Sequence, residues 1–245
     1  GLATTGKIPF ASTFAMFAAG RAFDQIRNSV AYPKLNVKIC PTHAGISLGE
    51  DGGSHQSVED IALMRAIPGM VVLQPADATE TEKIIFAAAK YEGPVYVRLG
   101  RLPVADIYTE DYNFEIGKAS TLTQGNDVAI IATGLLVGEA LKAQEILKEK
   151  GINVRVINMS TIKPLDEEVV LKAARECKLV ITSEEHSIIG GLGSAVSEYL
   201  SSVNPVKVIR HGINDVFGQS ADGNVMLDKY GLRADNLVEL VLKNI

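Results

Sequence analysis

The sequence predicts an α/β protein of two domains with mainly parallel sheets. Short apolar, β-rich runs alternate with longer runs of helical periodicity, a pattern typical of strands joined by helical crossovers. The 245 residues, of which 47% are hydrophobic, can form two ordinary cores. The alternation is lost between residues 103 and 123, where isolated Pro and Gly stand among Asp, Tyr, Asn and Glu. We therefore expect domains at 1–112 and 124–245, joined by a linker at 113–123.

The first block begins as a strand–helix–strand unit and continues with further alternating elements. Asp77 and Glu80 stand three residues apart, which is the spacing of a capping box at a helix start. The expected strands cover 7–11, 36–40, 70–74 and 94–99, and the expected helices cover 14–32, 58–67 and 77–91.

The second block repeats the alternation. Lys148 and Lys150 suit the carboxyl end of a helix, and Gly151 suits its stop. The expected strands cover 127–133, 154–158, 179–183 and 206–210, and the expected helices cover 137–150, 166–177, 193–200 and 234–242. Parallel strands with right-handed crossovers follow from this order.

Composition excludes several classes of partner. The formal net charge of -5 gives no basic stripe for nucleic acid, and no apolar run approaches the ~20 residues that span a bilayer. Cys40 and Cys177 are far apart and stand in no Cys-x-x-Cys or histidine cluster. We expect both cysteines to be small buried residues of a cytoplasmic protein, and we expect no metal site on this chain.

The most informative segment runs from His43 to His55. Two histidines flank a loop that holds Asp51 and four glycines, directly after the strand that ends at Cys40. Histidine and aspartate suit proton transfer and the orientation of hydroxyl groups near neutral pH, and glycines let the backbone approach a ligand closely. Because α/β folds bind ligands at the carboxyl ends of their strands, we expect this loop to be a functional site.

Other motifs leave alternatives open. Phe14 and Phe17 stand three apart on a helix, which suits core packing or contact with a planar ligand. An arginine at a strand end can bind a phosphate or pair with a surface acid, and Arg98 and Arg101 are both candidates. Two further segments read first as ordinary turn and loop residues, namely the glycine-rich turn at 190–193 and the acidic run at 184–186.

The run from Thr42 to Gln56 closely resembles the pyrimidine-binding domain of transketolases, which use thiamine diphosphate. The resemblance continues through 63–70, 74–77 and 98–101, and the second block is similar to the transketolase C-terminal domain. It implies two doubly wound domains and the C-terminal half of the family's chain. The implied activity is transfer of a two-carbon ketol unit from a ketose phosphate to an aldose phosphate.

The resemblance also implies roles for six side chains. His55 and His43 correspond to catalytic histidines, His55 near the substrate carbonyl and His43 beside the sugar phosphate. Asp51 matches the carboxylate that binds the aldose C2 hydroxyl, and Arg101 matches an arginine on the phosphate. The aromatic wall around the aminopyrimidine corresponds to Phe14 and Phe17, and the third aromatic of some members is replaced by Ala11.

Two family features are not found in the sequence. The glutamate that protonates the aminopyrimidine would precede the position equivalent to Gly1, so we expect the sequence to begin part-way into its first domain. The diphosphate-binding domain, with its Gly-Asp-Gly and Asn metal ligands, is not found either. We therefore expect activity only with a separate N-terminal subunit that supplies the ligands for Mg²⁺ or Ca²⁺, within a heterotetramer.

Three other interpretations stay open. The segment 12–14 and the helix at 21–25 match deoxyxylulose phosphate synthase, although His43 beside the glycine loop fits transketolase better. The β subunit of a 2-oxo acid dehydrogenase is a weaker match, because acyl transfer has no evident need for Asp51 and Arg101. A non-catalytic assembly subunit would not need all four of the polar site residues.

Overall fold

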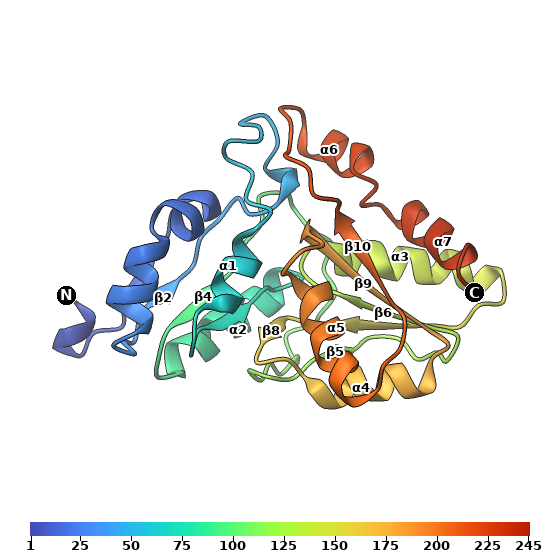
Figure 1. Cartoon of the computed structure of the whole chain (residues 1–245), viewed down its shortest axis with the longest axis horizontal. Coiled ribbons are helices and arrows are strands. Elements are labelled where there is room, and N and C mark those ends of the chain that lie inside the picture. The colour runs from blue at the N-terminus through green and yellow to red at the C-terminus, as the bar shows by residue number, and fades with distance from the viewer.

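The computed structural model describes residues 1–245 and contains two five-stranded sheets side by side (Figure 1). The first sheet has the order β1 (Phe10–Ala11), β2 (Lys38–Ile39), β4 (Val95–Val97), β3 (Val71–Leu73) and β8 (Thr161–Lys163). Its first four strands are parallel, and β8 is antiparallel to β3.

The second sheet is built from longer strands. It has the order β10 (Val208–Ile213), β9 (Leu179–Ser187), β6 (Val128–Ala132), β7 (Val154–Asn158) and β5 (Ser120–Thr121). Only β5 runs antiparallel to its neighbour. Both sheets therefore confirm the predicted α/β class with mainly parallel strands.

Helices cover both faces of each sheet. In the first domain the π-helices η2 (Met16–Arg21) and η3 (Gln25–Ala31) share a core with α1 (Asp60–Ala66), and α2 (Ala78–Lys90) packs in a separate core. In the second domain α3 (Leu136–Glu149) and α7 (Ala234–Leu242) share one core, and α4 (Glu167–Glu176) and α5 (Leu192–Val203) share another. Because each sheet lies between two cores, both domains are doubly wound, as predicted.

A fifth core joins the two domains. Ile46 in the short 3₁₀ helix η4 (Ile46–Leu48) and Val58 before α1 pack with residues of the second domain, among them Leu136, Ile213 and Met226 of α6 (Gly223–Lys229). The segment that contains the predicted site loop is therefore anchored on the C-terminal domain. No helix is long and apolar enough to cross a membrane.

The observed elements differ from the predicted ones in three ways. The single helix expected over 14–32 is two π-helical segments, because apolar spacing does not reveal which carbonyl each amide bonds. The strand expected to end at 183 continues to Ser187. The prediction followed the apolar run, whereas residues 184–186 are polar and yet buried in the strand. β5, β8 and the helix α6 were not predicted, because two or three strand residues or a helix of seven residues give no readable period.

Candidate active site

The loop from His43 to His55 follows β2 and lies beside a segment of the second domain, residues 214–222 (Figure 1). The two backbones touch. A Cβ atom on Gly53 would come within 2.7 Å of the Gly218 carbonyl oxygen, and the Ser220 hydroxyl donates a hydrogen bond to the Glu50 carbonyl. The glycines predicted to allow close approach therefore allow contact between the domains.

Four rings form one wall beside this loop. Phe14 stacks on His43 with ring centroids 4.1 Å apart and an interplanar angle of 11°. Phe14 and Phe17 are nearly parallel, with centroids 6.0 Å apart. His55 forms T-shaped contacts with Phe17 and Phe14, with ring centroids 5.2 and 6.2 Å apart. All four rings are only half-buried, so the two phenylalanines belong to an accessible surface and not to a closed core.

The backbone orients the two histidines. Phe14 reaches His43 because it forms an isolated parallel bridge with Thr42. His43 has a φ of 61°, uncommon for a residue other than glycine, and its Nδ1 lies 2.8 Å from the Thr42 hydroxyl. The Nδ1 of His55 lies 3.0 Å from the Ser54 hydroxyl. Each imidazole therefore has one nitrogen occupied by a neighbouring hydroxyl and its Nε2 free.

Two charged side chains face His43. Burial and the Arg101 guanidinium lower the pKa of His43, and the Asp51 carboxylate opposes them. Arg101 and Asp51 approach to 4.0 Å, with side chains 45% and 46% exposed. Arg101 also donates to the Leu48 carbonyl at 2.5 Å, which holds it against the loop. The structure therefore brings the histidine, the acid and the arginine to one accessible surface.

The two candidate arginines differ completely in environment. Arg98 is fully buried and its guanidinium lies 2.8 Å from the Asp60 carboxylate, which also accepts a 2.8 Å hydrogen bond from Tyr96. Burial opposes ionisation of Asp60, but Arg98 lowers the pKa of that carboxyl. Arg98 also donates to the carbonyls of Ser57 and Glu185. Arg98 is thus a structural cation, and Arg101 is the arginine available to a ligand.

Residues 184–186 are not an exposed acidic loop. All three side chains are buried in β9. The Glu185 carboxylate accepts a 2.5 Å hydrogen bond from the Ser47 amide, and a side chain on Gly45 would collide with it. Burial raises the pKa of Glu185, although Arg98 counteracts it. Polar residues that directly extend an apolar strand were the signal for this buried support of the site loop.

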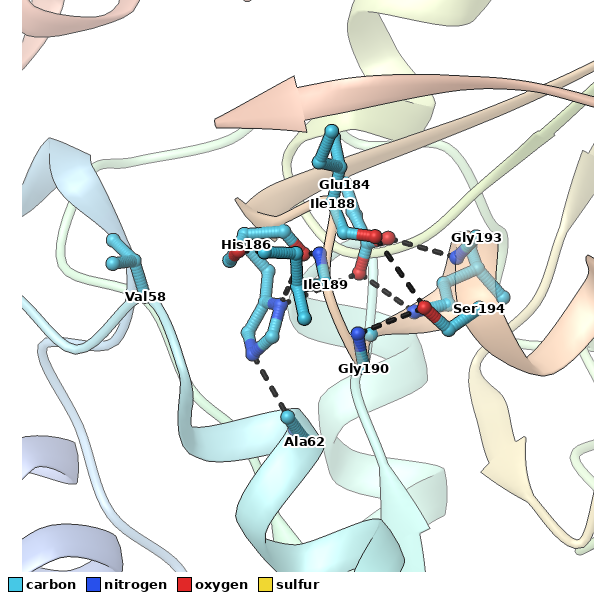
Figure 2. Close-up of polar contacts among 12 residues, drawn as sticks. Val58, Ala62, Glu184, His186, Ile188, Ile189, Gly190, Gly193 and Ser194 are labelled. Atoms are coloured by element: carbon cyan, nitrogen blue, oxygen red, sulfur yellow. Dashed lines mark hydrogen bonds and ion pairs between the residues drawn. The ribbon is translucent and has the colours of Figure 1, made fainter. Parts of the chain in front are cut away.

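Glu184 and His186 of β9 lie beside the glycine-rich turn that follows this strand (Figure 2). The Glu184 carboxylate accepts hydrogen bonds of 2.7 and 2.8 Å from the amides of Leu192 and Gly193, at the start of α5. His186 lies 3.7 Å from that carboxylate and its Nε2 accepts from the Ala62 amide of the first domain at 3.4 Å. The glycine-rich turn at 190–193 therefore has its anion-binding amides filled by the chain's own carboxylate.

No group of three or more His, Cys, Asp or Glu side chains is arranged to hold a metal ion. Cys40 and Cys177 are buried free thiols. The aromatic wall is the part of the site that fits a flat heteroaromatic ring, because its four rings are only half-buried and keep part of their surface accessible.

Comparison with known proteins finds a matching family model for each of the two domains. Residues 1–105 match the family model for the transketolase pyrimidine-binding domain, and residues 117–237 match that for the transketolase C-terminal domain. The proposed transketolase C-terminal section of Methanocaldococcus jannaschii is 55% identical over 247 residues, covering 99% of this chain and 77% of that protein.

Two further proteins extend the comparison. A 6-deoxy-6-sulfo-D-fructose transketolase subunit of Clostridium sp. strain MSTE9 is 45% identical over 238 residues, which cover 97% of this chain and 74% of the relative. A solved structure of a split-gene transketolase, described as an inactive β4 tetramer, is 52% identical with a TM-score of 0.93 and covers 99% of this chain and 78% of that one. Sequence motifs, fold and relatives thus agree, and the chain belongs to the transketolase family.

Proposed function

We propose that this chain is the C-terminal subunit of a two-subunit transketolase that moves a two-carbon ketol unit from a ketose phosphate to an aldose phosphate. The observation that carries the proposal is the cluster of Phe14, Phe17, His43 and His55 beside an exposed Arg101–Asp51 pair. An apolar ring surface, two imidazoles and an exposed cation suit a heteroaromatic cofactor and a phosphorylated sugar.

Phe14 and Phe17 are the residues that would hold thiamine diphosphate, through its aminopyrimidine ring. When bound, thiamine diphosphate supplies a carbanion that can break and form carbon–carbon bonds beside a carbonyl group. The phenyl rings of Phe14 and Phe17 would cover part of that ring and exclude water from it. Mg²⁺ or Ca²⁺ would be held by ligands on the partner subunit.

The polar residues have distinct proposed tasks. His55 and His43 each keep Nε2 free, so they can donate or accept a proton at the substrate's carbonyl and hydroxyl oxygens. The lowered pKa of His43 favours the neutral imidazole, which can act as a base. Asp51 can accept a hydrogen bond from a sugar hydroxyl, and Arg101 can bind the phosphate with the donors that Leu48 leaves free.

The comparisons support a two-subunit arrangement. The Clostridium relative is named a transketolase subunit, and the split-gene structure is an inactive tetramer of β chains. Both fit a chain that needs an N-terminal subunit, which we propose to assemble with it as a heterotetramer. We retain 1–112, 113–123 and 124–245 as the proposed domain and linker ranges, and the two buried free thiols favour the cytoplasm as the proposed compartment.

The decisive experiment measures ketol transfer from xylulose 5-phosphate to ribose 5-phosphate with thiamine diphosphate and Mg²⁺. The full-length chain is assayed with and without its N-terminal partner. Activity in the mixture and none in either subunit alone is the expected result, and His55→Ala should reduce it strongly. No transfer at any subunit ratio would contradict the proposal.

The same mixture tests the alternatives. Pyruvate with glyceraldehyde 3-phosphate is the substrate pair that would reveal a deoxyxylulose phosphate synthase, and we expect no product from it. Because the Clostridium relative is named for a sulfonated ketose, 6-deoxy-6-sulfo-D-fructose should be tested as a donor beside xylulose 5-phosphate. A clear preference for the sulfonate would replace the proposed donor while leaving the reaction type in place.

A further inference from the structure

The aromatic ring of Phe217 has no role in the fold of this chain. Phe217 follows β10, in the segment 214–222 that touches the site loop, and it is 84% exposed. Its neighbour Val216 is 52% exposed. Large apolar side chains that stand together at a protein surface often mark a place where another protein binds. Phe217 is therefore a candidate contact for a partner.

The backbone around Phe217 is fixed, so its exposure does not come from a loose loop. The Tyr230 hydroxyl donates a 2.9 Å hydrogen bond to the Phe217 carbonyl, and the Gln56 amide donates to the Gln219 carbonyl at 2.9 Å. Gly218, between them, packs so closely that an added Cβ would lie 1.7 Å from the Gln56 Oε1. An aromatic ring on a fixed backbone loses little conformational entropy on binding, and such rings commonly dominate the binding energy of an interface.

The surface beside Phe217 is concave. A hollow of about 370 Å³ is lined by Phe217 together with Val216, Lys229 and Tyr230. A partner can therefore enclose the exposed ring in an apolar pocket of its own and place a side chain in the hollow. This shape suits a protein surface better than an isolated exposed ring does.

Arg21, at the end of η2, is a second exposed group without a partner. Its guanidinium carbon lies 4.8 Å from the centroid of the Phe17 ring. No ion pair within this chain includes Arg21. A guanidinium that lies over a ring can still donate hydrogen bonds to a carboxylate. Arg21 thus places an unpaired cation beside the aromatic wall of the candidate active site.

The positions of these two groups indicate which molecule covers them. The segment of Phe217 touches the site loop at Glu50 and Gly53 (Figure 1), and Arg21 lies on the aromatic wall. No cluster of side chains on this chain is arranged to hold a metal ion. Under the proposed function the N-terminal subunit supplies those ligands to a cofactor that lies on the wall. That subunit must therefore cover the wall and the site loop, and it meets Arg21 and Phe217 there.

We propose that Phe217 and Arg21 anchor this chain to its N-terminal subunit. Phe217 would fill an apolar pocket of that subunit, and Arg21 would pair with one of its carboxylates. The proposal rests on the proposed function for the existence of the partner, and it adds the surface that binds this partner. Phe217 takes no part in the chemistry, so assembly and catalysis can be tested separately.

Surface plasmon resonance between the full-length chain and the N-terminal subunit, with thiamine diphosphate and Mg²⁺, measures the docking. Phe217→Ser should raise the Kd roughly 30-fold or more, as expected for an aromatic anchor. Phe86→Ser is the matched control, because Phe86 is a 60% exposed phenylalanine on α2, and it should change the Kd by less than about twofold. Since both rings are exposed, both variants should unfold at the wild-type temperature.

Arg21→Gln tests the cation separately. The Kd should rise about fivefold and should depend less steeply on salt concentration, because one ionic contact is lost. Arg175→Gln removes an exposed arginine on α4 and should leave both quantities unchanged. At a saturating concentration of the N-terminal subunit, Phe217→Ser should reach the wild-type kcat, since only assembly is weakened.

The possible failures can be told apart. Wild-type Kd in Phe217→Ser would overturn this docking surface and leave the two-subunit enzyme in place. A wild-type chain that does not bind the N-terminal subunit would overturn both proposals. Binding that depends on Phe217 without any ketol transfer would support the docking surface and contradict the proposed reaction.

A second copy of this chain is the competing occupant. Analytical ultracentrifugation of the chain alone should give the same mass for the wild type and for Phe217→Ser. A lower mass for the variant would show that the ring binds another copy of this chain, and it would overturn the proposal.

Discussion

The two domains of this chain are built differently. In the first sheet the parallel strands have two or three residues each, whereas β6, β7, β9 and β10 of the second sheet have five to nine. Yet all six proposed site residues lie in the first domain, on loops and helix starts. The domain with the weaker backbone ladder therefore carries the chemistry, and its loop depends on support from elsewhere.

That support comes from buried polar side chains and from the second domain. Gln56 donates to the Ile46 carbonyl at 3.0 Å and to the Gln219 carbonyl at 2.9 Å, so one amide joins the loop to the neighbouring domain. The Glu185 carboxylate of the second domain accepts a hydrogen bond from the Ser47 amide of the loop. A site on flexible glycines can thus be positioned by a rigid neighbour that contributes none of its proposed reactive groups.

The largest expected effect comes from removing the Asp60 carboxylate, which is part of the buried polar support of the first domain. Asp60→Ala leaves Arg98 as a fully buried cation without its partner, so we expect a loss of about 3–5 kcal/mol in the free energy of unfolding. Urea denaturation followed by circular dichroism measures it. The control is Glu239→Ala, which removes an exposed pair with Lys243 and should change stability by less than about 1 kcal/mol. Similar losses in both variants would show that the buried pair has no special role.

Glycine substitutions should have effects of intermediate size, and they test how far the second domain supports the site loop of the first. A Cβ on Gly218 would lie 1.7 Å from the Gln56 Oε1, so Gly218→Ala should displace the amide that joins the domains and cost about 1–3 kcal/mol. Gly138→Ala is the matched control, because Gly138 lies within α3 with nothing within 4 Å of its added Cβ. It should stabilise the protein by about 0.5–1 kcal/mol. Thermal unfolding of both variants measures these changes. A stabilising Gly218→Ala would contradict the role of the Gln56 amide in joining the two domains.

The smallest effect concerns the titration of His43. Its pKa lies below 6.5, chiefly because of burial and then because of Arg101. A lowered histidine pKa means that its contribution to stability is present above pH 6.5 and is lost as the pH falls below that value. NMR titration of the imidazole signals should show the His43 midpoint rising in Arg101→Gln and falling in Asp51→Asn. A shift in the same direction for both variants would show that these charges do not face the ring.

The regular elements were predictable because they are amphipathic or continuously apolar. β7 and α7 have the predicted bounds, and Asp77 caps α2 through the Glu80 amide at 2.7 Å, as its spacing indicated. The loop from His43 to His55 could be identified as a site because its residue types and its place after a strand are local properties. Whether its residues take the proposed roles stays a prediction.

The support of the site was not predictable, because it depends on contacts between residues far apart in sequence. The choice between Arg98 and Arg101 could not be made from spacing, since it depends on Asp60 being buried beside one of them. Glu185 looked like an ordinary surface acid for the same reason. Its partner, Ser47, lies 138 positions away.

The strand β8 makes the two domains a single modular unit. It belongs to the second domain by sequence, yet it completes the first sheet at β3, and Lys163 donates to the carbonyls of Arg65 and Ile67 at the end of α1. A fragment that ended at the linker would leave the edge of β3 unpaired and prone to aggregate. Engineered chimeras should therefore exchange the two domains together, with the gene cut outside them and not between them.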